Sequence, residues 1–108
     1  MSKHRPRIKA VERFKKKLTI ENLWIYIIKI LTLENPLKAY DVKKRLLDLY
    51  GIKPATVTVY AVLYKMCREG LIETVRVGGE TLYKPTKRGV EALNEARKII
   101  RNIENILE

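Results

Sequence analysis

The sequence predicts a mainly α-helical fold that carries one small β-hairpin (α+β). Apolar residues recur at helical spacing in several stretches of the chain. From Leu71 to Lys84 apolar and polar residues alternate instead, around the pair Gly78-Gly79, which is typical of a two-residue hairpin turn. A helix ending in Glu-Gly-Leu-Ile, followed at once by this hairpin and by another helix, is typical of a winged helix-turn-helix.

We expect the chain to have two parts. Residues 1–18 are predicted to be a basic arm that is partly helical, because Ile8, Val11, Phe14 and Leu18 recur at helical spacing. Residues 19–108 are predicted to be the winged-helix domain, including a C-terminal helix over about 86–107. A chain of 108 residues has room for a single core.

The first helix of this domain follows Thr19, which we expect to be its N-cap. A broad apolar stripe then consists of Ile20, Leu23, Trp24, Ile27, Ile28 and Leu31. Pro36 ends the helix, because the residue before a proline avoids the α region. A second helix is predicted over residues 39–50, with Leu49 turned inward and Gly51 as a left-handed stop.

A third helix is predicted to begin near Ala55 or Thr56 and to end at Gly70. Its inward face carries Val59, Leu63 and Met66. The opposite face combines small, hydroxyl-bearing, aromatic and basic residues, namely Val57, Thr58, Ala61, Tyr64, Lys65 and Arg68. An ordinary solvated helix would carry a mixture of Glu and Lys there, so this face is a candidate binding surface.

Thr86 is predicted to cap the last helix, although Gly89 in its first turn weakens that start. The helix then carries an isoleucine-rich seam that is longer than a small core can cover. We therefore expect it to pair with the same helix of a second copy, in an antiparallel or crossing arrangement. The expected interface residues are Trp24, Ile28, Leu93, Ile100, Ile103 and Leu107.

The composition argues against catalysis and against bound metals or cofactors. One cysteine and one histidine are too few for a disulfide within the chain or for a zinc site of the usual kind. No phosphate-binding loop, dinucleotide-binding turn or serine nucleophile motif is present. Cys67 is expected to be a small buried helix residue, with redox sensing as the alternative.

The longest apolar run is too short to cross a membrane, and no signal-peptide pattern opens the chain. We therefore expect a soluble cytoplasmic protein associated with the nucleoid and without a membrane partner. Glutamine is absent, whereas isoleucine, lysine, arginine and glutamate are plentiful, a bias that fits a protein from a hot environment.

The net charge of +11 indicates a polyanionic partner, and double-stranded DNA is the expected one. The first 17 residues hold eight basic side chains and one acidic side chain, so they contribute +7. In the arm, Arg5 and Arg7 are candidates for a minor-groove contact, with a solubilising tail as the alternative. The other candidate DNA-binding residues are Lys43, Lys44, Lys53, Thr56, Val57, Thr58, Tyr60, Ala61, Tyr64, Lys65, Arg68, Arg76 and Lys84. For Tyr60 the core and a phosphate contact remain equal alternatives.

Residues 39–93 resemble the PadR family of winged-helix transcriptional repressors. The segment Ala39-Tyr40-Asp41-Val42 is similar to the opening of that family's second helix. Its third helix is matched by Thr58-Val59-Tyr60 with Glu69-Gly70-Leu71-Ile72 at the same interval. The segment Leu82-Tyr83-Lys84-Pro85-Thr86-Lys87-Arg88-Gly89 resembles the end of its wing.

This resemblance implies a homodimer held by the first and last helices of the domain, which represses a promoter and in some members is released by a small molecule. A flat aromatic effector could bind beside Trp24 and Tyr26, although aromatic residues of this kind also serve as core. Two functions remain: a sequence-selective dimeric regulator, or a winged helix used as a protein-interaction or architectural nucleic-acid-binding module with little sequence preference.

Overall fold

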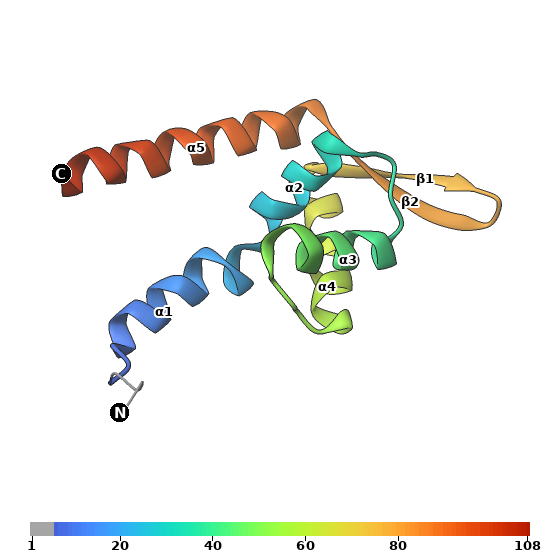
Figure 1. The fold of residues 1–108 in the computed structure, drawn as a ribbon. Coiled ribbons are helices and arrows are strands. Elements are labelled where there is room, and N and C mark those ends of the chain that lie inside the picture. Colours follow the sequence, from blue (N-terminus) through green and yellow to red (C-terminus); the bar gives the residue numbers. More distant parts are fainter. Residues whose placement is uncertain (1–5) are drawn as a thin grey trace.

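The computed structural model describes residues 6–108 of the chain. Its elements are α1 (Lys9–Leu18), the 3-10 turn η1 (Ile20–Asn22), α2 (Leu23–Leu33), α3 (Ala39–Tyr50), α4 (Thr56–Arg68), β1 (Ile72–Val77), β2 (Glu80–Pro85) and α5 (Lys87–Leu107). Helices α2, α3 and α4 gather in one body, from which the hairpin projects on one side and α1 and α5 extend on the other (Figure 1). This confirms the predicted winged-helix fold with its long C-terminal helix.

The core lies around α2, which packs against α3, α4, α5 and β2. The predicted stripe is buried along α2 except at Trp24, which is half-buried. Ile20, the first residue of that stripe, lies in η1 and is exposed. Ile30 lies outside that stripe and is buried as well, because elements cover α2 on more than one side. Leu49 of α3 is 52% exposed, so the prediction that it points inward is wrong.

The expected N-cap at Thr19 is also wrong. The hydroxyl of Thr19 donates a hydrogen bond to the backbone oxygen of Lys15, 2.8 Å away, so it satisfies the end of α1 instead of the start of α2. The turn η1 then separates the two helices.

Polar contacts at one end hold α1 in place. The Tyr26 hydroxyl donates to the backbone oxygen of Leu18 at 2.6 Å, and the Asn22 amide donates to the backbone oxygen of Lys17. Lys17 lies 2.7 Å from a carboxylate oxygen of Glu21, and this hydrogen bond lowers the pKa of Glu21. No residue of α1 is buried.

The turns follow the sequence prediction. Gly51 ends α3 with a φ of +66°, and Gly78 and Gly79 form the hairpin turn with φ values of +56° and +82°. These left-handed conformations favour glycine. The antiparallel register pairs Val77 with Glu80 across the turn and Ile72 with Pro85 at the base.

Three elements meet at Leu71, between α4 and the hairpin. The Thr86 hydroxyl donates to the Gly70 oxygen at 2.6 Å and accepts from the Gly89 amide at 3.0 Å, which confirms Thr86 as the N-cap of α5. The Thr86 amide also donates to the Leu71 oxygen at 3.1 Å. A Cβ atom at Gly89 would overlap the Leu71 oxygen and lie 2.9 Å from Cδ1 of Ile28, so Gly89 allows this close approach.

Within residues 6–108, no helix combines the length and the apolar character that crossing a membrane requires.

We predict that Gly89→Ala lowers the free energy of unfolding by about 2 kcal/mol, because overpacking against backbone costs about 1–3 kcal/mol. Alanine would otherwise favour a helix by about 1 kcal/mol, so the sign of the change tests the close approach. Urea unfolding followed by circular dichroism measures it. The control Glu91→Ala, at an exposed site of α5, should change stability by less than about 0.5 kcal/mol. Equal stability of Gly89→Ala and the wild type would contradict the prediction.

Candidate nucleic-acid interface

Helix α4 turns its predicted binding surface outward. Val59, Leu63 and Met66 are buried in the core, as predicted. The surface that we name the α4 face consists of Val57, Thr58, Ala61, Tyr64, Lys65 and Arg68. All of these residues are exposed except Thr58, which is half-buried at the edge. The small residue Ala61 lies between larger neighbours one turn away on either side, so another surface could approach the helix closely there.

The C-terminal half of the α4 face is basic. The Arg68 guanidinium lies 5.8 Å from the centre of the Tyr64 ring, which is a cation–π contact across one helical turn. Lys65 is exposed beside it. Among the described residues neither Lys65 nor Arg68 forms an ion pair, so both cations can meet an anionic partner.

Helix α3 and the following turn bring further cations to the start of α4. The Lys43 ammonium donates to the Thr56 hydroxyl at 2.9 Å, so the two predicted residues lie together at the N-terminus of α4. Lys44 lies 3.8 Å from the carboxylate of Asp48. Lys53 is exposed in the turn and lines a shallow pocket with Lys43 and Lys44.

Both predicted cations of the wing are held by neighbouring groups. The Arg76 guanidinium donates to the Thr81 hydroxyl at 2.6 Å and to the Gly79 oxygen at 3.0 Å, which fixes its direction at the tip of the hairpin. Lys84 lies 3.9 Å from the carboxylate of Glu73 on the opposite strand. An anion at the wing would therefore compete with Glu73 for Lys84.

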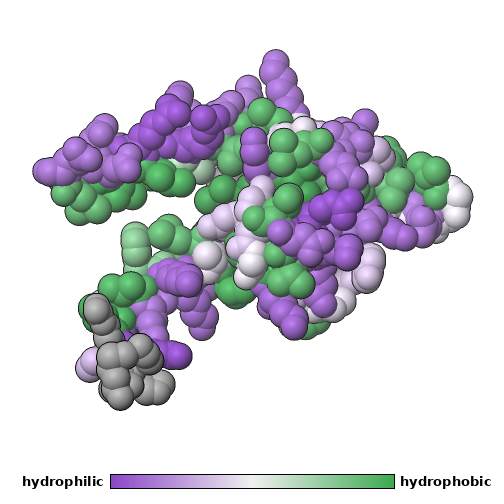
Figure 2. Space-filling view, viewed as in Figure 1, coloured by the Kyte–Doolittle hydropathy of each residue, from purple (hydrophilic) through white to green (hydrophobic). Residues whose placement is uncertain are grey.

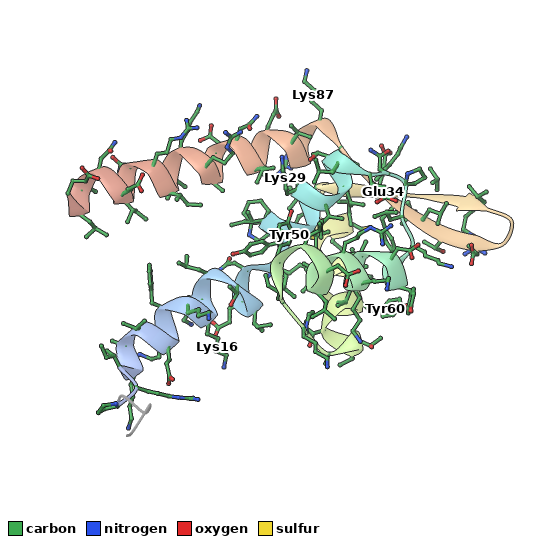
Figure 3. The ribbon with its side chains drawn as sticks, in the orientation of Figure 1. Lys16, Lys29, Glu34, Tyr50, Tyr60 and Lys87 are labelled. Atoms are coloured by element: carbon green, nitrogen blue, oxygen red, sulfur yellow. The ribbon has the colours of Figure 1, made fainter. Side chains whose placement is uncertain are left out.

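The structure resolves the position of Tyr60. Its side chain is 54% exposed on α4 (Figure 3), so it is not a core residue. Tyr60 lines two small pockets, and Tyr40, which is also exposed, lines both of them as well. Tyr40 was not among the contacts predicted from the sequence. A tyrosine in the first turn of a predicted helix, two residues after the basic residue Lys38, is the sequence signal that could have identified Tyr40.

Of the two arm candidates, the structure describes only Arg7. Arg7 lies before α1 and pairs with Glu12 at 3.3 Å. Arg5 lies outside the described residues.

Five of the six predicted dimer residues divide into two groups; the sixth, Trp24, is half-buried, and its place in an interface stays a prediction. Ile28 is 0% exposed and Leu93 is buried as well, so neither offers much surface to a second copy, because both pack in the core of their own chain. Ile100, Ile103 and Leu107 are 52%, 46% and 77% exposed along the outer half of α5. We therefore take only these three forward as interface candidates.

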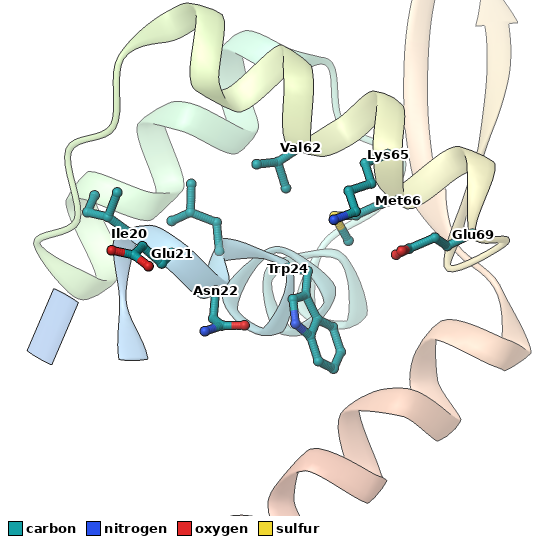
Figure 4. Close-up of a pocket in the computed structure, with 9 residues that line it drawn as sticks. Ile20, Glu21, Asn22, Trp24, Val62, Lys65, Met66 and Glu69 are labelled. Atoms are coloured by element: carbon teal, nitrogen blue, oxygen red, sulfur yellow. The ribbon is translucent and has the colours of Figure 1, made fainter. Parts of the chain in front are cut away.

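Trp24 lines a pocket of about 250 Å³ behind α4 (Figure 4). The indole lies on one side, and Val62, Lys65 and Met66 of α4 lie on the other. Tyr26 does not line this pocket, because its ring packs against Tyr50 at a centroid distance of 5.5 Å. The two aromatic residues predicted to share one cleft thus belong to different parts of the surface.

Cys67 is half-buried on α4, and burial raises the pKa of its thiol. A raised pKa leaves less thiolate, which is the reactive form, so the environment favours the structural role over redox sensing.

Comparisons with known proteins give similarities of fold alone. No protein-family model matches the sequence, and no curated protein matches it. A PadR family transcriptional regulator from Eggerthella lenta is 22% identical, with 93% of this chain and 94% of that chain covered and a TM-score of 0.68. A PadR-like transcriptional regulator from Bacillus cereus is 20% identical, with 87% and 97% covered and a TM-score of 0.68.

A winged-helix DNA-binding protein from STIV is also similar, at 15% identity, with 79% of this chain and 92% of that chain covered and a TM-score of 0.68. At such identities the similarity concerns the fold. The chain therefore has the winged-helix fold that is found in PadR family regulators.

Proposed function

We propose that this chain is a dimeric, sequence-selective DNA-binding protein that represses transcription. It would be located in the cytoplasm, in association with the nucleoid. The observation that carries the proposal is the α4 face. It exposes small, hydroxyl-bearing and basic side chains on a helix flanked by the cations of α3 and by the wing. A helix with this surface fits the major groove, and the wing lies where the neighbouring backbone or minor groove would pass.

The chemistry of the α4 face supports a division of roles. Its first half carries Val57, Thr58 and Ala61, whose methyl groups fit thymine methyls and whose hydroxyl suits a base or a phosphate. Its second half carries Lys65 and Arg68, which suit phosphates. The first half holds none of the side chains that usually read guanine, so much of the affinity would come from phosphate contacts and from DNA shape.

The outer half of α5 supports the homodimer. The part of α5 that extends beyond the core of its own chain exposes Ile100, Ile103 and Leu107. Contiguous apolar surface of this kind marks interaction sites. Pairing of two α5 helices would bury it and present two α4 faces together. Repression would then follow from occupation of an inverted repeat in a promoter.

Footprinting on DNA selected from a random pool tests the proposal. We expect protection of a near-palindrome whose half-sites lie about 34 Å apart, or one helical turn. Uniform protection of any duplex would contradict sequence selectivity and would favour an architectural role.

We predict that Lys65→Ala weakens binding to selected and unselected duplexes alike, because a phosphate contact carries no sequence information. The slope of log K against log salt should become shallower by about 0.9, because the variant neutralises one phosphate fewer. The control variant is Lys87→Ala, which should keep the slope of the wild type. Figure 3 shows Lys87 on the side of the molecule opposite Tyr60 of α4. An unchanged slope for Lys65→Ala would exclude this lysine from the interface with DNA.

We predict that flat aromatic compounds quench the fluorescence of Trp24, the single tryptophan, by stacking in the pocket behind α4. Because Lys65 borders the pocket, a bound compound should also weaken DNA binding. Fluorescence titration gives the binding curve, and Val62→Phe, which fills the pocket without adding a second tryptophan, is the control variant. Quenching that rises linearly without saturation would argue against a site.

A further inference from the structure

The smaller of the two pockets that Tyr60 lines has a volume of about 150 Å³. A water molecule takes up about 30 Å³ in the liquid, so this pocket has room for a group of a few heavy atoms. Ala39 and Val59 line it with buried apolar side chains. The rest of its lining is polar and consists of Tyr40, Lys43, Thr56 and Tyr60. We name it the α3–α4 pocket, because these two helices supply all of its lining.

Every polar side chain of the α3–α4 pocket can donate a hydrogen bond, and none is a carboxylate. The Lys43 ammonium donates to the Thr56 hydroxyl at 2.9 Å, so the hydrogen of that hydroxyl remains available for another acceptor. Among the described residues, the hydroxyls of Tyr40 and Tyr60 form no hydrogen bond, and Lys43 forms no ion pair. Donors gathered around one small space fit a group that only accepts, which is an oxyanion.

Two acidic residues lie near the pocket without lining it. Glu80 of β2 lines the adjoining pocket, where the Lys38 ammonium lies 3.7 Å from its carboxylate. Asp41 follows Tyr40 on α3 but is not part of the lining. An anion in the α3–α4 pocket would therefore contact Lys43 directly, whereas Lys38 offsets the repulsion from Glu80.

The α3–α4 pocket lies away from the surfaces that are expected to pair in a homodimer. Tyr40 and Tyr60 also line the adjoining pocket together with Thr81 and Tyr83 of β2, so the site is next to the wing. In Figure 2 the apolar sides of α1 and α5 face each other across an open gap, and these helices extend on the side of the body opposite the wing (Figure 1). Pairing through α5 would leave the α3–α4 pocket open.

We propose that the α3–α4 pocket is a site for one phosphate group, which is held by Lys43, Thr56 and the hydroxyls of Tyr40 and Tyr60. The inference rests on the proposed function and adds a defined anchor to it. In a helix-turn-helix the helix before the recognition helix crosses the DNA backbone, so a backbone phosphate is one source of the group. Inorganic phosphate is the other source, and it would compete with DNA for the same site. A backbone phosphate held here would fix the register in which α4 enters the groove.

Neutral methylphosphonate linkages, placed one at a time in a selected duplex, test the backbone source. A single position in a half-site should weaken binding of the wild type by about tenfold, because hydrogen bonds to a charged group are lost there. Tyr40→Phe removes one hydroxyl and should weaken binding to the unmodified duplex by about fivefold. On the duplex with the critical linkage the same variant should cost less than about twofold, because the partner of the hydroxyl is already lost. The control Tyr50→Phe, at the opposite end of α3, should bind both duplexes as the wild type does.

Inorganic phosphate and chloride at equal ionic strength test the free ion. Binding to the unmodified duplex should be weaker in phosphate than in chloride. In nitrogen-15 spectra of the free protein, phosphate should shift the amide resonances of Tyr40 and Thr56 until they saturate, whereas chloride should not. The double variant Tyr40→Phe/Tyr60→Phe should lose both effects. Both tyrosines are exposed, so this variant keeps the fold, and circular dichroism checks it.

The two experiments separate the phosphate site from the proposed function. If no linkage depends on Tyr40 and phosphate gives no saturating shift, the site is overturned, while a footprint on the selected duplex still supports the regulator. If no duplex is bound selectively, the proposed function fails, and a saturating shift confined to the pocket assigns the site to free phosphate. If Tyr40→Phe weakens binding equally on every duplex, whether modified or not, the hydroxyl acts on the shape of the interface and the backbone source is overturned.

Discussion

The hydrogen bonds around Leu71 determine how the parts of this molecule are oriented. Thr86 binds the Gly70 and Leu71 oxygens, and Gly89 lets α5 approach the same backbone more closely than any side chain would allow. The end of α4, the start of the wing and the start of α5 are thus joined within a few residues. Because α5 cannot tilt without breaking this joint, any arrangement of two α5 helices also sets the arrangement of two α4 faces.

Most cations of the candidate interface already have partners on the protein. Lys43 binds Thr56, Lys44 lies near Asp48, and Lys84 lies near Glu73. Each exposed pair contributes little to stability, so DNA phosphates could replace these partners at low cost. The exchange nevertheless reduces the net gain per contact. Lys65 and Arg68, which have no acidic partner among the described residues, should therefore contribute more than their number suggests.

The sequence predicted the order of the elements, the hairpin turn and the outward surface of α4, because these follow from periodicity and from glycine positions. It failed where the outcome depends on which neighbour covers a side chain. Periodicity predicted that Leu49 of α3 points inward, but it cannot show that no neighbour covers this side chain. The sequence also placed Ile28 at a subunit interface, because it cannot show that α2 is covered on several sides within its own chain. Thr19 was misassigned because a hydroxyl between two helices can satisfy either end, and only the backbone geometry decides which.

The single chain leaves the outer half of α5 without a covering surface. At about 1.5 Å per residue, the 21 residues of α5 extend about 31 Å, well beyond the small core formed by α2, α3 and α4. Its buried residues Gly89, Leu93 and Ala96 all lie in its first half, where it crosses that core. A seam that continues past the core costs free energy in water unless another surface removes it from solvent. The seam and the rigid joint at Leu71 therefore act together, because whatever covers the outer half of α5 also fixes the direction of the α4 face.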